Sequence, residues 1–485
     1  MTDIIVIGAG PAGVLAALRA AELGARTELV TSGEFGGMAA NDGPVPVRAL
    51  AYAARLIRDA RQLPQYGITL SEPVLDYSRL LARVREVVHD VRARSTLRQR
   101  IDDLGVTVHE QAGAAGFADP HTIETERRLR LQAERFVICT GGMSRRLPIP
   151  GFELTSTHSD AWKLTSVPAS MLVIGAGNTG VQVASIFHAF GTRVQLFEAG
   201  PSILATEEGE VAAAVRSALR ASGMVVQEQF GTIDSFEKTP TGVRMKLSKN
   251  GRSESAEAAL AVVAVGWVAD TTRLNLAEVG VELNPRRFIK VDEYLRTSVP
   301  HIFAAGDVTG RLMLVPGAVE DGFVAATNAV QGPTHPLEQR INPSGSFTDP
   351  EYAQVGLTEA RARETHDVVT AVVHFDETVR TVIEGRTFGF CKLIADRETY
   401  RILGCHVVGE RAVDIIQVAA IAMASGVRVD ELARVAISFP TYAEILIRVA
   451  ALAAHQLNLP LSWQAHQAEG GIRTAQTGGS ADDNP

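Results

Sequence analysis

Short apolar runs alternate along this chain with glycine clusters and apolar stretches that fit a helix. Asp3–Ile7 is a short run of strand-forming residues, followed by a glycine cluster and the apolar stretch Val14–Leu23. The same order returns at Met171–Ile174, where a second glycine cluster leads into an apolar stretch ending near Phe190. A strand, a glycine-rich turn and a helix in this order predict an α/β fold.

Two other regions have a different pattern. Tyr77–Leu104 carries apolar residues on a 3.6-residue period and is predicted to be one long amphipathic helix. From Ile341 onward the composition becomes β-rich, with short apolar runs separated by turn residues, which indicates a separate domain.

The two glycine clusters both have the spacing G-x-G-x-x-G between a strand and a helix. In that context the glycines let backbone approach a pyrophosphate, and the helix N-terminus offers N–H groups and a partial positive charge. A glycine-rich turn without ligand is the alternative for one match alone, and one vestigial site is the alternative for the pair. The predicted nucleotide contacts are Gly8, Gly10, Pro11, Ala12 and Gly13 in the first cluster and Gly175, Gly177, Asn178, Thr179 and Gly180 in the second.

Each site needs a carboxylate after the next strand to bind ribose hydroxyls. The strand Arg193–Phe197 ends in Glu198, which would accept from a ribose 2′-OH and repel a 2′-phosphate, so NADH is predicted over NADPH. The corresponding strand Arg26–Thr31 offers Thr31 and Ser32, with Glu34 slightly later, so that contact is weakened or moved.

Composition narrows the class of protein. A chain of 485 residues is long enough for two to four domains, and its 46% hydrophobic and 21% charged content is typical of soluble globular proteins. The net charge of −8 argues against a nucleic-acid-binding surface, and no stretch predicts a membrane span or a signal peptide. Cys139, Cys391 and Cys405 form neither a CxxC nor a metal spacing, so a metal-free cytoplasmic protein is expected.

Residues 36–50, which begin with Gly36 and Gly37, resemble the redox-active segment of the pyridine nucleotide-disulfide oxidoreductases, such as dihydrolipoamide dehydrogenase, glutathione reductase and mercuric reductase. That family carries Gly-Gly-x-Cys-x-x-x-x-Cys-x-Pro-x-Lys here, with the cysteine pair against the flavin. In this chain Ala39 and Pro44 occupy the cysteine positions and Arg48 the lysine position.

Further motifs extend the resemblance over nearly the whole chain. Phe136–Gly142 is similar to the family's ATG motif, Ile302–Val308 to its second flavin motif, and Leu314–Ala318 to the start of a helix beside the flavin. Asp307 in the second motif is implied to bind a ribityl hydroxyl, although such an Asp could merely cap a helix. The resemblance adds Gly36, Gly37, Thr140, Gly141, Gly266, Gly306, Asp307 and Ala318 to the implied cofactor contacts.

The implied architecture is two Rossmann-like dinucleotide-binding domains, for FAD and NAD, plus a C-terminal α+β dimerisation domain. The expected boundaries are residues 1–149 and 271–335 for the FAD domain, 150–270 for the NAD domain, 336–464 for the dimerisation domain and 465–485 for a disordered tail. The implied partners are a second copy of the chain and a small-molecule electron acceptor.

The family's His-Pro-x-x-x-Glu motif, which carries the base that serves the thiols, reads Phe439-Pro440-Thr441-Tyr442-Ala443-Glu444 here. Phe439 stands at the base position and Glu444 is retained. Thiol chemistry has therefore been lost as a unit, and an inactive relic is the alternative. Because Cys139 is expected to be a core residue and no cysteine is expected near the flavin, disulfide, dihydrolipoamide and mercuric-ion reduction are not predicted.

One more substitution changes the charge expected beside the flavin. Where the family pairs a lysine with a glutamate, this chain has Arg48 and Gln182, which leaves about one uncompensated positive charge. That charge could stabilise reduced flavin or polarise an acceptor oxygen; alternatively Arg48 pairs with Asp42 or the partner subunit's Glu444 and is structural. Asn178 is smaller than the aromatic residue of many relatives and would leave the nicotinamide entrance more open; alternatively a loop fills that space.

The predicted activity is that of an FAD-dependent NADH oxidoreductase. Hydride would pass from NADH through flavin N5 to a diffusible acceptor such as a quinone, in a pocket lined by Ala39, Ala40 and Pro44. Phe439 and Tyr442 would line it from across the dimer, and Glu444 or Tyr442 would relay a proton.

Three alternatives follow from the same residues. The segment from Phe439 to Leu452 is also similar to soluble pyridine nucleotide transhydrogenases, and an NADH oxidase would use the same half-reaction. A flavin-binding dimer without turnover would explain the weakened acid at Thr31.

Overall fold

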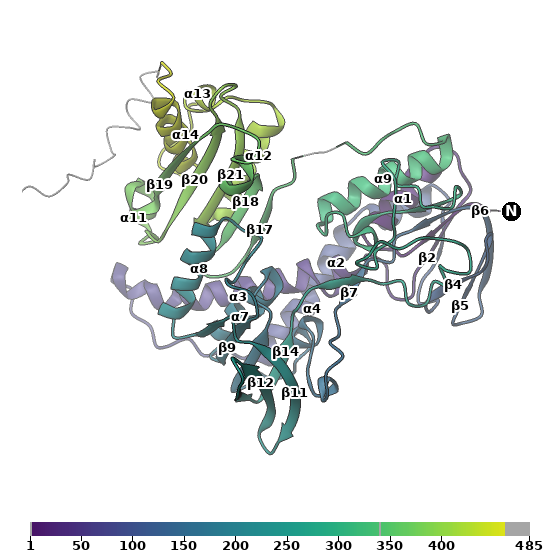
Figure 1. The fold of residues 1–485 in the computed structure, drawn as a ribbon, viewed down its shortest axis with the longest axis horizontal. Helices are drawn as coiled ribbons and strands as arrows, with labels where there is room; N and C mark the ends of the chain where they lie inside the picture. Colours follow the sequence, from purple (N-terminus) through teal and green to yellow (C-terminus); the bar gives the residue numbers. More distant parts are fainter. Residues whose placement is uncertain (1, 339–340, 461–485) are drawn as a thin grey trace, which may run out of the picture. The chain divides into compact units, whose positions relative to one another are not determined.

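The computed structural model describes residues 2–338 and 341–460, and these form two compact units. The N-terminal unit contains residues up to Leu204 and from Leu219 to 338, and the C-terminal unit contains Ala205–Ala218 and residues from 341 (Figure 1). The domain boundaries expected inside these units stay a prediction, and the expected tail at 465–485 lies outside the described residues.

The first sheet of the N-terminal unit is built around β1, which pairs in parallel with β2 on one side and β6 on the other. The strand order is β3-β2-β1-β6-β5-β4, with β16 also beside β6 and with β4 and β5 antiparallel. The bounds are β1 Thr2–Ile7, β2 Thr27–Val30, β3 Thr107–His109, β4 Ala115–Asp119, β5 Thr122–Thr125, β6 Arg130–Ile138 and β16 Ile302–Ala304.

Helices α1 (Pro11–Glu22) and α9 (Val315–Gln331) pack against each other beside this sheet (Figure 1). Their backbones approach so closely that a Cβ added at Gly322 of α9 would lie 2.1 Å from the carbonyl oxygen of Ala12. This contact brings together two segments that lie about three hundred residues apart in the sequence.

A second parallel sheet, in the order β10-β9-β8-β14, carries helix α7 (Asn178–Ala189) after β8. A separate antiparallel sheet, β11-β12-β13, follows in the chain, and β7 pairs with β15 in a two-stranded ribbon. The bounds are β7 Gly142–Ser144, β8 Ser170–Ile174, β9 Arg193–Glu198, β10 Val225–Glu228, β11 Thr232–Thr239, β12 Gly242–Lys249, β13 Arg252–Ala258, β14 Leu260–Val263 and β15 Trp267–Ala269.

The single long helix predicted over Tyr77–Leu104 is wrong. The structure has α4 (Tyr77–Arg94) and a separate α5 (Leu97–Asp103). Ser95 takes an extended conformation, and its hydroxyl accepts a hydrogen bond from the Leu97 N–H at 3.4 Å. Serine and threonine compete with helical backbone hydrogen bonds in this way, and the 3.6-residue period alone did not reveal the break.

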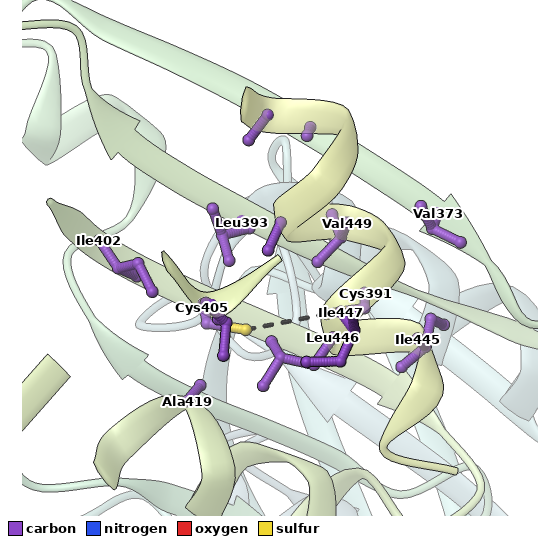
Figure 2. Packing of buried hydrophobic residues seen from close by; sticks show 14 of the residues in the cluster. Val373, Cys391, Leu393, Ile402, Cys405, Ala419, Ile445, Leu446, Ile447 and Val449 are labelled. Carbon is purple, nitrogen blue, oxygen red and sulfur yellow. Dashed lines mark hydrogen bonds between the residues drawn. The ribbon is translucent and has the colours of Figure 1, made fainter. Parts of the chain in front are cut away.

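The C-terminal unit contains a five-stranded antiparallel sheet in the order β17-β18-β21-β20-β19. Helices α12 and α14 pack on it around a large apolar core, part of which Figure 2 shows. The bounds are β17 Ser344–Ser346, β18 Tyr352–Gly356, β19 Val368–His374, β20 Gly389–Asp396, β21 Ile402–Gly409, α12 Ala412–Ala424 and α14 Glu444–Gln456.

The α/β architecture predicted from the sequence is confirmed: two sheets built on parallel strands lie in the N-terminal unit, and an antiparallel sheet with helices forms the C-terminal unit. Within residues 2–338 and 341–460, none of the helices combines the length and apolar character needed to cross a bilayer. The bounds of other α-helices in the described residues are α2 Gly37–Asn41, α3 Pro44–Gln62, α6 His158–Trp162, α8 Gly209–Ala221, α10 Glu359–Ala362, α11 Val379–Ile383 and α13 Val429–Leu432.

Substituting Gly322→Ala tests the close contact between α1 and α9. The new methyl group would meet backbone, which cannot rotate away, so overpacking should outweigh the gain in helix propensity. We expect the unfolding temperature, followed by circular dichroism, to fall by roughly 2–10 °C. The control Gly33→Ala, at an exposed glycine whose added Cβ meets no atom within 4 Å, should leave it unchanged. Equal unfolding temperatures for the two variants would contradict the contact.

Candidate dinucleotide sites and the cysteine-free segment

The first glycine cluster forms a tight turn between β1 and α1. Gly8 has φ +108°, and a Cβ on Gly13 would lie 1.7 Å from the Gly8 carbonyl oxygen, so neither position accepts a side chain. Gly10 is the N-cap of α1, and a Cβ added there would meet no protein atom within 4 Å. The turn therefore leaves open space in front of the helix N-terminus, where a phosphate would bind.

The second cluster repeats this stereochemistry at α7. Gly175 has φ +92°, and a Cβ on Gly180 would lie 1.8 Å from the Gly175 carbonyl oxygen. Gly177 is the N-cap with φ −75° and ψ −176°, nearly the values of Gly10, and the space at its Cβ is also open. Asn178 and Thr179 follow at the exposed helix start. The two turns are therefore both shaped to receive a pyrophosphate.

The predicted flavin contacts from distant parts of the chain gather around the first turn. Gly36 donates its N–H to the Ala9 carbonyl oxygen at 2.9 Å, and a Cβ on Gly37 would lie 2.6 Å from the Cα of Gly10. A Cβ on Gly306 would lie 3.0 Å from the Cβ of Ala12 and 3.5 Å from that of Ala318. Only residues with small side chains or none fit where these segments meet.

Asp307 lies just after β16, and burial raises the pKa of its carboxyl group. Its neighbour Asp321 was not predicted from the sequence. Asp321 is a buried carboxylate in α9 that accepts the Gly306 N–H at 3.1 Å. Burial raises the pKa of Asp321, and this hydrogen bond opposes the shift. Asp321 thus holds the turn that presents Asp307; its position in an apolar helix was the available signal.

Thr140 and Gly141 lie where the chain leaves β6. The Thr140 hydroxyl donates to the Asp270 carbonyl oxygen at 2.7 Å, and the Asp270 N–H donates to the Gly141 carbonyl oxygen at 3.1 Å. Gly266, at φ +107°, accepts the Arg145 N–H at 3.0 Å. These contacts join the two strands, β7 and β15, through which the chain passes between the two nucleotide-binding sheets.

The end of β2 has no carboxylate of its own. Thr31 is buried and Ser32 is exposed, while Glu34 forms an ion pair with Arg92. Glu110, which the sequence analysis missed, accepts the Phe35 N–H at 3.0 Å. It follows β3, the strand next to β2, so its place at the end of a neighbouring strand was the signal. The carboxylate that binds the Phe35 backbone at this edge therefore comes from the end of a neighbouring strand.

Glu198 ends β9, as predicted, and its carboxylate is held by backbone. One oxygen accepts the Ala176 N–H at 2.9 Å and the other the Gly200 N–H at 2.7 Å. The carboxylate therefore lies directly beside the second glycine turn, where a nucleotide ribose would be recognised.

The segment that resembles the family's redox-active region forms α2 and the start of α3. Ala39 lies in α2, and Pro44 is the first residue of α3. Arg48 in α3 donates from Nη1 to Gln182 Oε1 in α7 at 3.1 Å, so this predicted pair is in contact. Asp42, the alternative partner of Arg48, forms an ion pair with Lys163 at 3.3 Å.

The expectation that no cysteine lies near the flavin motifs is wrong for Cys139. Its side chain lies in the apolar core behind the first glycine turn, with its Cβ 3.3 Å from the Cβ that an alanine at Gly13 would have. Burial raises the pKa of this thiol, so it is not a thiolate at neutral pH. Cys391 and Cys405 lie in the core of the C-terminal unit with their sulfurs 3.8 Å apart (Figure 2).

The C-terminal candidates lie on the segment that leads into α14. Phe439 is 70% exposed. The Tyr442 hydroxyl donates to Glu384 Oε2 at 2.6 Å, and burial together with this carboxylate raises the pKa of the phenol. Glu444 Oε1 lies 3.7 Å from Nη1 of the buried Arg448, and burial raises the pKa of Glu444 against the effect of that arginine.

Comparison with known proteins decides which family these sites belong to. The profile of the family described as "Pyridine nucleotide-disulphide oxidoreductase" matches residues 2–322, and that of its dimerisation domain matches residues 342–450. The chain belongs to the pyridine nucleotide-disulphide oxidoreductase family. It is 32% identical to the mercuric reductase of Lysinibacillus sphaericus, with 93% of this chain and 82% of that protein aligned. It is also 32% identical to the dihydrolipoyl dehydrogenase of Geobacillus stearothermophilus, with 93% and 96% aligned.

Solved structures with the same fold include a flavoprotein disulfide reductase. The structure of the HOCl-induced flavoprotein disulfide reductase RclA from Escherichia coli superimposes with a TM-score of 0.81, at 24% identity, and covers 93% of this chain and 99% of that one. Family membership makes the protein an FAD-dependent pyridine nucleotide oxidoreductase with a dimerisation domain that supports a homodimer. The two open glycine turns fit FAD at α1 and the pyridine nucleotide at α7.

Substituting alanine for Gly10 or for Gly177 should impair one nucleotide site at a time. Each methyl group meets no protein atom but occupies the space where a phosphate would lie. We expect Gly10→Ala to lower the FAD content of the purified protein, measured by absorbance. Gly177→Ala should retain FAD and weaken NAD⁺ binding in calorimetry about tenfold, or about 1.4 kcal/mol. Each variant serves as the control for the other; loss of FAD in Gly177→Ala would contradict the assignment.

Proposed function

We propose that this enzyme transfers electrons from NADH to a diffusible organic acceptor, such as a quinone, and does not reduce disulfides. The observation that carries the proposal is the absence of sulfur and imidazole from the family's reactive positions, which Ala39, Pro44 and Phe439 occupy. The chain's three cysteines are all buried elsewhere. FAD, when bound, supplies the two-electron chemistry that links oxidation of NADH to reduction of the acceptor.

The side chains at these positions favour a flat, apolar oxidant. Ala39, Ala40 and Pro44 are small or apolar and leave room where the family has a disulfide. Phe439 presents an exposed aromatic ring. The resemblance to the family implies that this segment reaches the flavin of the partner subunit. An aromatic ring would stack on a quinone in an offset or edge-to-face geometry.

Arg48 supports electron transfer to such an acceptor through its charge. The Arg48 guanidinium contacts Gln182 at 3.1 Å, and this amide, unlike a glutamate at the same position, adds no negative charge beside the cation. A fixed cation here would stabilise negative charge that develops on a quinone oxygen. Gln182 Nε2 is buried without a hydrogen-bond partner among the described residues, so Gln182 is held through its oxygen.

Glu444 is the better of the two proposed proton carriers. Tyr442 is a poor proton donor to a substrate, because its hydroxyl hydrogen is directed at Glu384 and its pKa is raised by burial and by that carboxylate. Glu444 has a raised pKa, and its Oε2 is buried without a hydrogen-bond partner among the described residues. Reduction of a quinone by NADH consumes one additional proton, which Glu444 Oε2 can hold.

Glu198 supports NADH as the electron donor. Its carboxylate is fixed beside the glycine turn at Ala176 and Gly200, and it would repel the 2′-phosphate of NADPH. This specificity argues against the soluble transhydrogenase alternative.

The acceptor can be identified by steady-state kinetics with NADH. We expect benzoquinones and naphthoquinones to be reduced, and lipoamide and glutathione disulfide to remain unreduced, because no thiol is available to exchange with them. Efficient reduction of either disulfide would overturn the proposal. Oxygen consumption without quinone turnover would favour an NADH oxidase, thio-NAD reduction a transhydrogenase, and a flavin that NADH does not bleach anaerobically a non-catalytic dimer.

A matched pair of variants tests the aromatic contact within this prediction. Phe439→Ala should raise the KM for a quinone about fivefold to tenfold, the value of one aromatic stacking contact, without changing the rate of anaerobic flavin bleaching by NADH. Phe388→Ala removes another exposed phenyl ring of the same unit and should change neither quantity.

Donor specificity is a separate prediction. We expect kcat/KM for NADH to exceed that for NADPH at least about 100-fold, because a like-charge contact costs several kcal/mol. Glu198→Gln keeps an oxygen for the Ala176 N–H and should narrow the ratio by improving the use of NADPH. A higher kcat/KM for NADPH in the unmodified enzyme would refute the role given to Glu198.

A further inference from the structure

The C-terminal unit contains an ammonium group that is almost completely buried. Lys392, in β20, is 2% exposed, and its Nζ lies 2.9 Å from Glu208, 3.0 Å from Glu210 and 2.7 Å from Glu359. Burial alone would lower the pKa of Lys392, but hydrogen bonds to Glu359, Glu208 and Glu210 outweigh it and raise the pKa. A buried charge is tolerated only with such partners, so this cluster resists separation.

Glu208 has a central place in the cluster because both of its oxygens are used. Oε1 accepts from Lys392, and Oε2 accepts the Glu359 N–H at 2.9 Å, at the first residue of α10. His406, opposite Lys392 on β21, lies with Nε2 3.9 Å from Oε2 of Glu208. Glu208 is itself 8% exposed. The carboxylate therefore fixes residue 208 to both β20 and α10.

The chain reaches Glu208 directly from the pyridine nucleotide site. Leu204, the last residue before this excursion into the C-terminal unit, donates its N–H to the Ala176 carbonyl oxygen at 2.9 Å. The N–H of Ala176 is bound by Glu198. The second glycine turn is therefore held on both sides by Glu198 and Leu204, and Leu204 precedes Glu208 by four residues.

We propose that Lys392 is a positioning residue for pyridine nucleotide binding: by holding Glu208, it restrains the short link to Leu204 and thereby the glycine turn at Ala176. The effect is carried by the covalent chain, so it requires no contact between Lys392 and the nucleotide. Releasing Glu208 would let residues 205–208 sample more conformations and would weaken the Leu204 hydrogen bond. The proposal does not depend on which acceptor the enzyme uses.

Two isosteric variants of the same cluster separate this role from simple stabilisation. Glu208→Gln and Glu359→Gln each remove one carboxylate charge from Lys392, but only Glu208 lies on the link to the nucleotide site. We expect Glu208→Gln to raise the Kd for NAD⁺, measured by calorimetry on the FAD-loaded enzyme, about threefold to tenfold. It should also speed hydrogen exchange in peptides covering residues 199–207. Glu359→Gln should lower the unfolding temperature and leave both quantities unchanged.

Substitutions at Lys392 itself complete the test. Lys392→Met should reproduce the weaker NAD⁺ binding of Glu208→Gln, and Lys392→Arg should restore part of it, with FAD content unchanged in both. If Lys392→Met does not fold, the comparison of Glu208→Gln with Glu359→Gln still tests the proposal. A purely structural cluster predicts that Glu208→Gln lowers the unfolding temperature without changing the Kd or the exchange rates, and this result overturns the proposal. Equal effects of Glu208→Gln and Glu359→Gln on the Kd also overturn it.

Discussion

The approach of a helix backbone to the carbonyl oxygen of its own glycine turn is the constraint on which both nucleotide sites depend. At Gly13 and at Gly180 an added Cβ would lie 1.7 Å and 1.8 Å from that oxygen, a distance that no side chain tolerates. The close approach aims the helix N-terminus at the end of its strand and leaves Gly10 and Gly177 facing open space. Pyrophosphate binding therefore follows from backbone geometry and owes little to particular side chains.

The residues proposed to shape the acceptor pocket are not part of this framework. Pro44 begins α3, a position where the missing N–H of proline costs no helical hydrogen bond and its fixed φ suits the helix. Ala39 lies in the short helix α2 without difficulty, since alanine is the best helix former. Alanine and proline at these two positions are therefore compatible with the local helices.

Site contacts were predictable from the sequence when the two residues lie close together along the chain. The glycine turns and Glu198 were predictable because their geometry is set within one strand–turn–helix unit. Partners far along the chain were not: Glu110 is 75 residues from Phe35, and Glu208 is 184 residues from Lys392. A lone Lys inside an apolar strand signals a buried ion pair, but no local rule names its partner.

In the proposed reaction, a phenyl ring at residue 439 in place of an imidazole would affect proton transfer more than electron transfer. A histidine titrates near neutral pH without help, whereas a carboxyl group needs burial to approach that range. Glu444 has that burial, but Arg448 partly opposes it, so the balance between the two sets how readily Glu444 holds a proton. Tyr442 cannot compensate, because Glu384 already accepts its hydroxyl hydrogen. In the proposed reaction, proton delivery from this segment therefore depends on how completely water is excluded around Glu444 when the acceptor is bound.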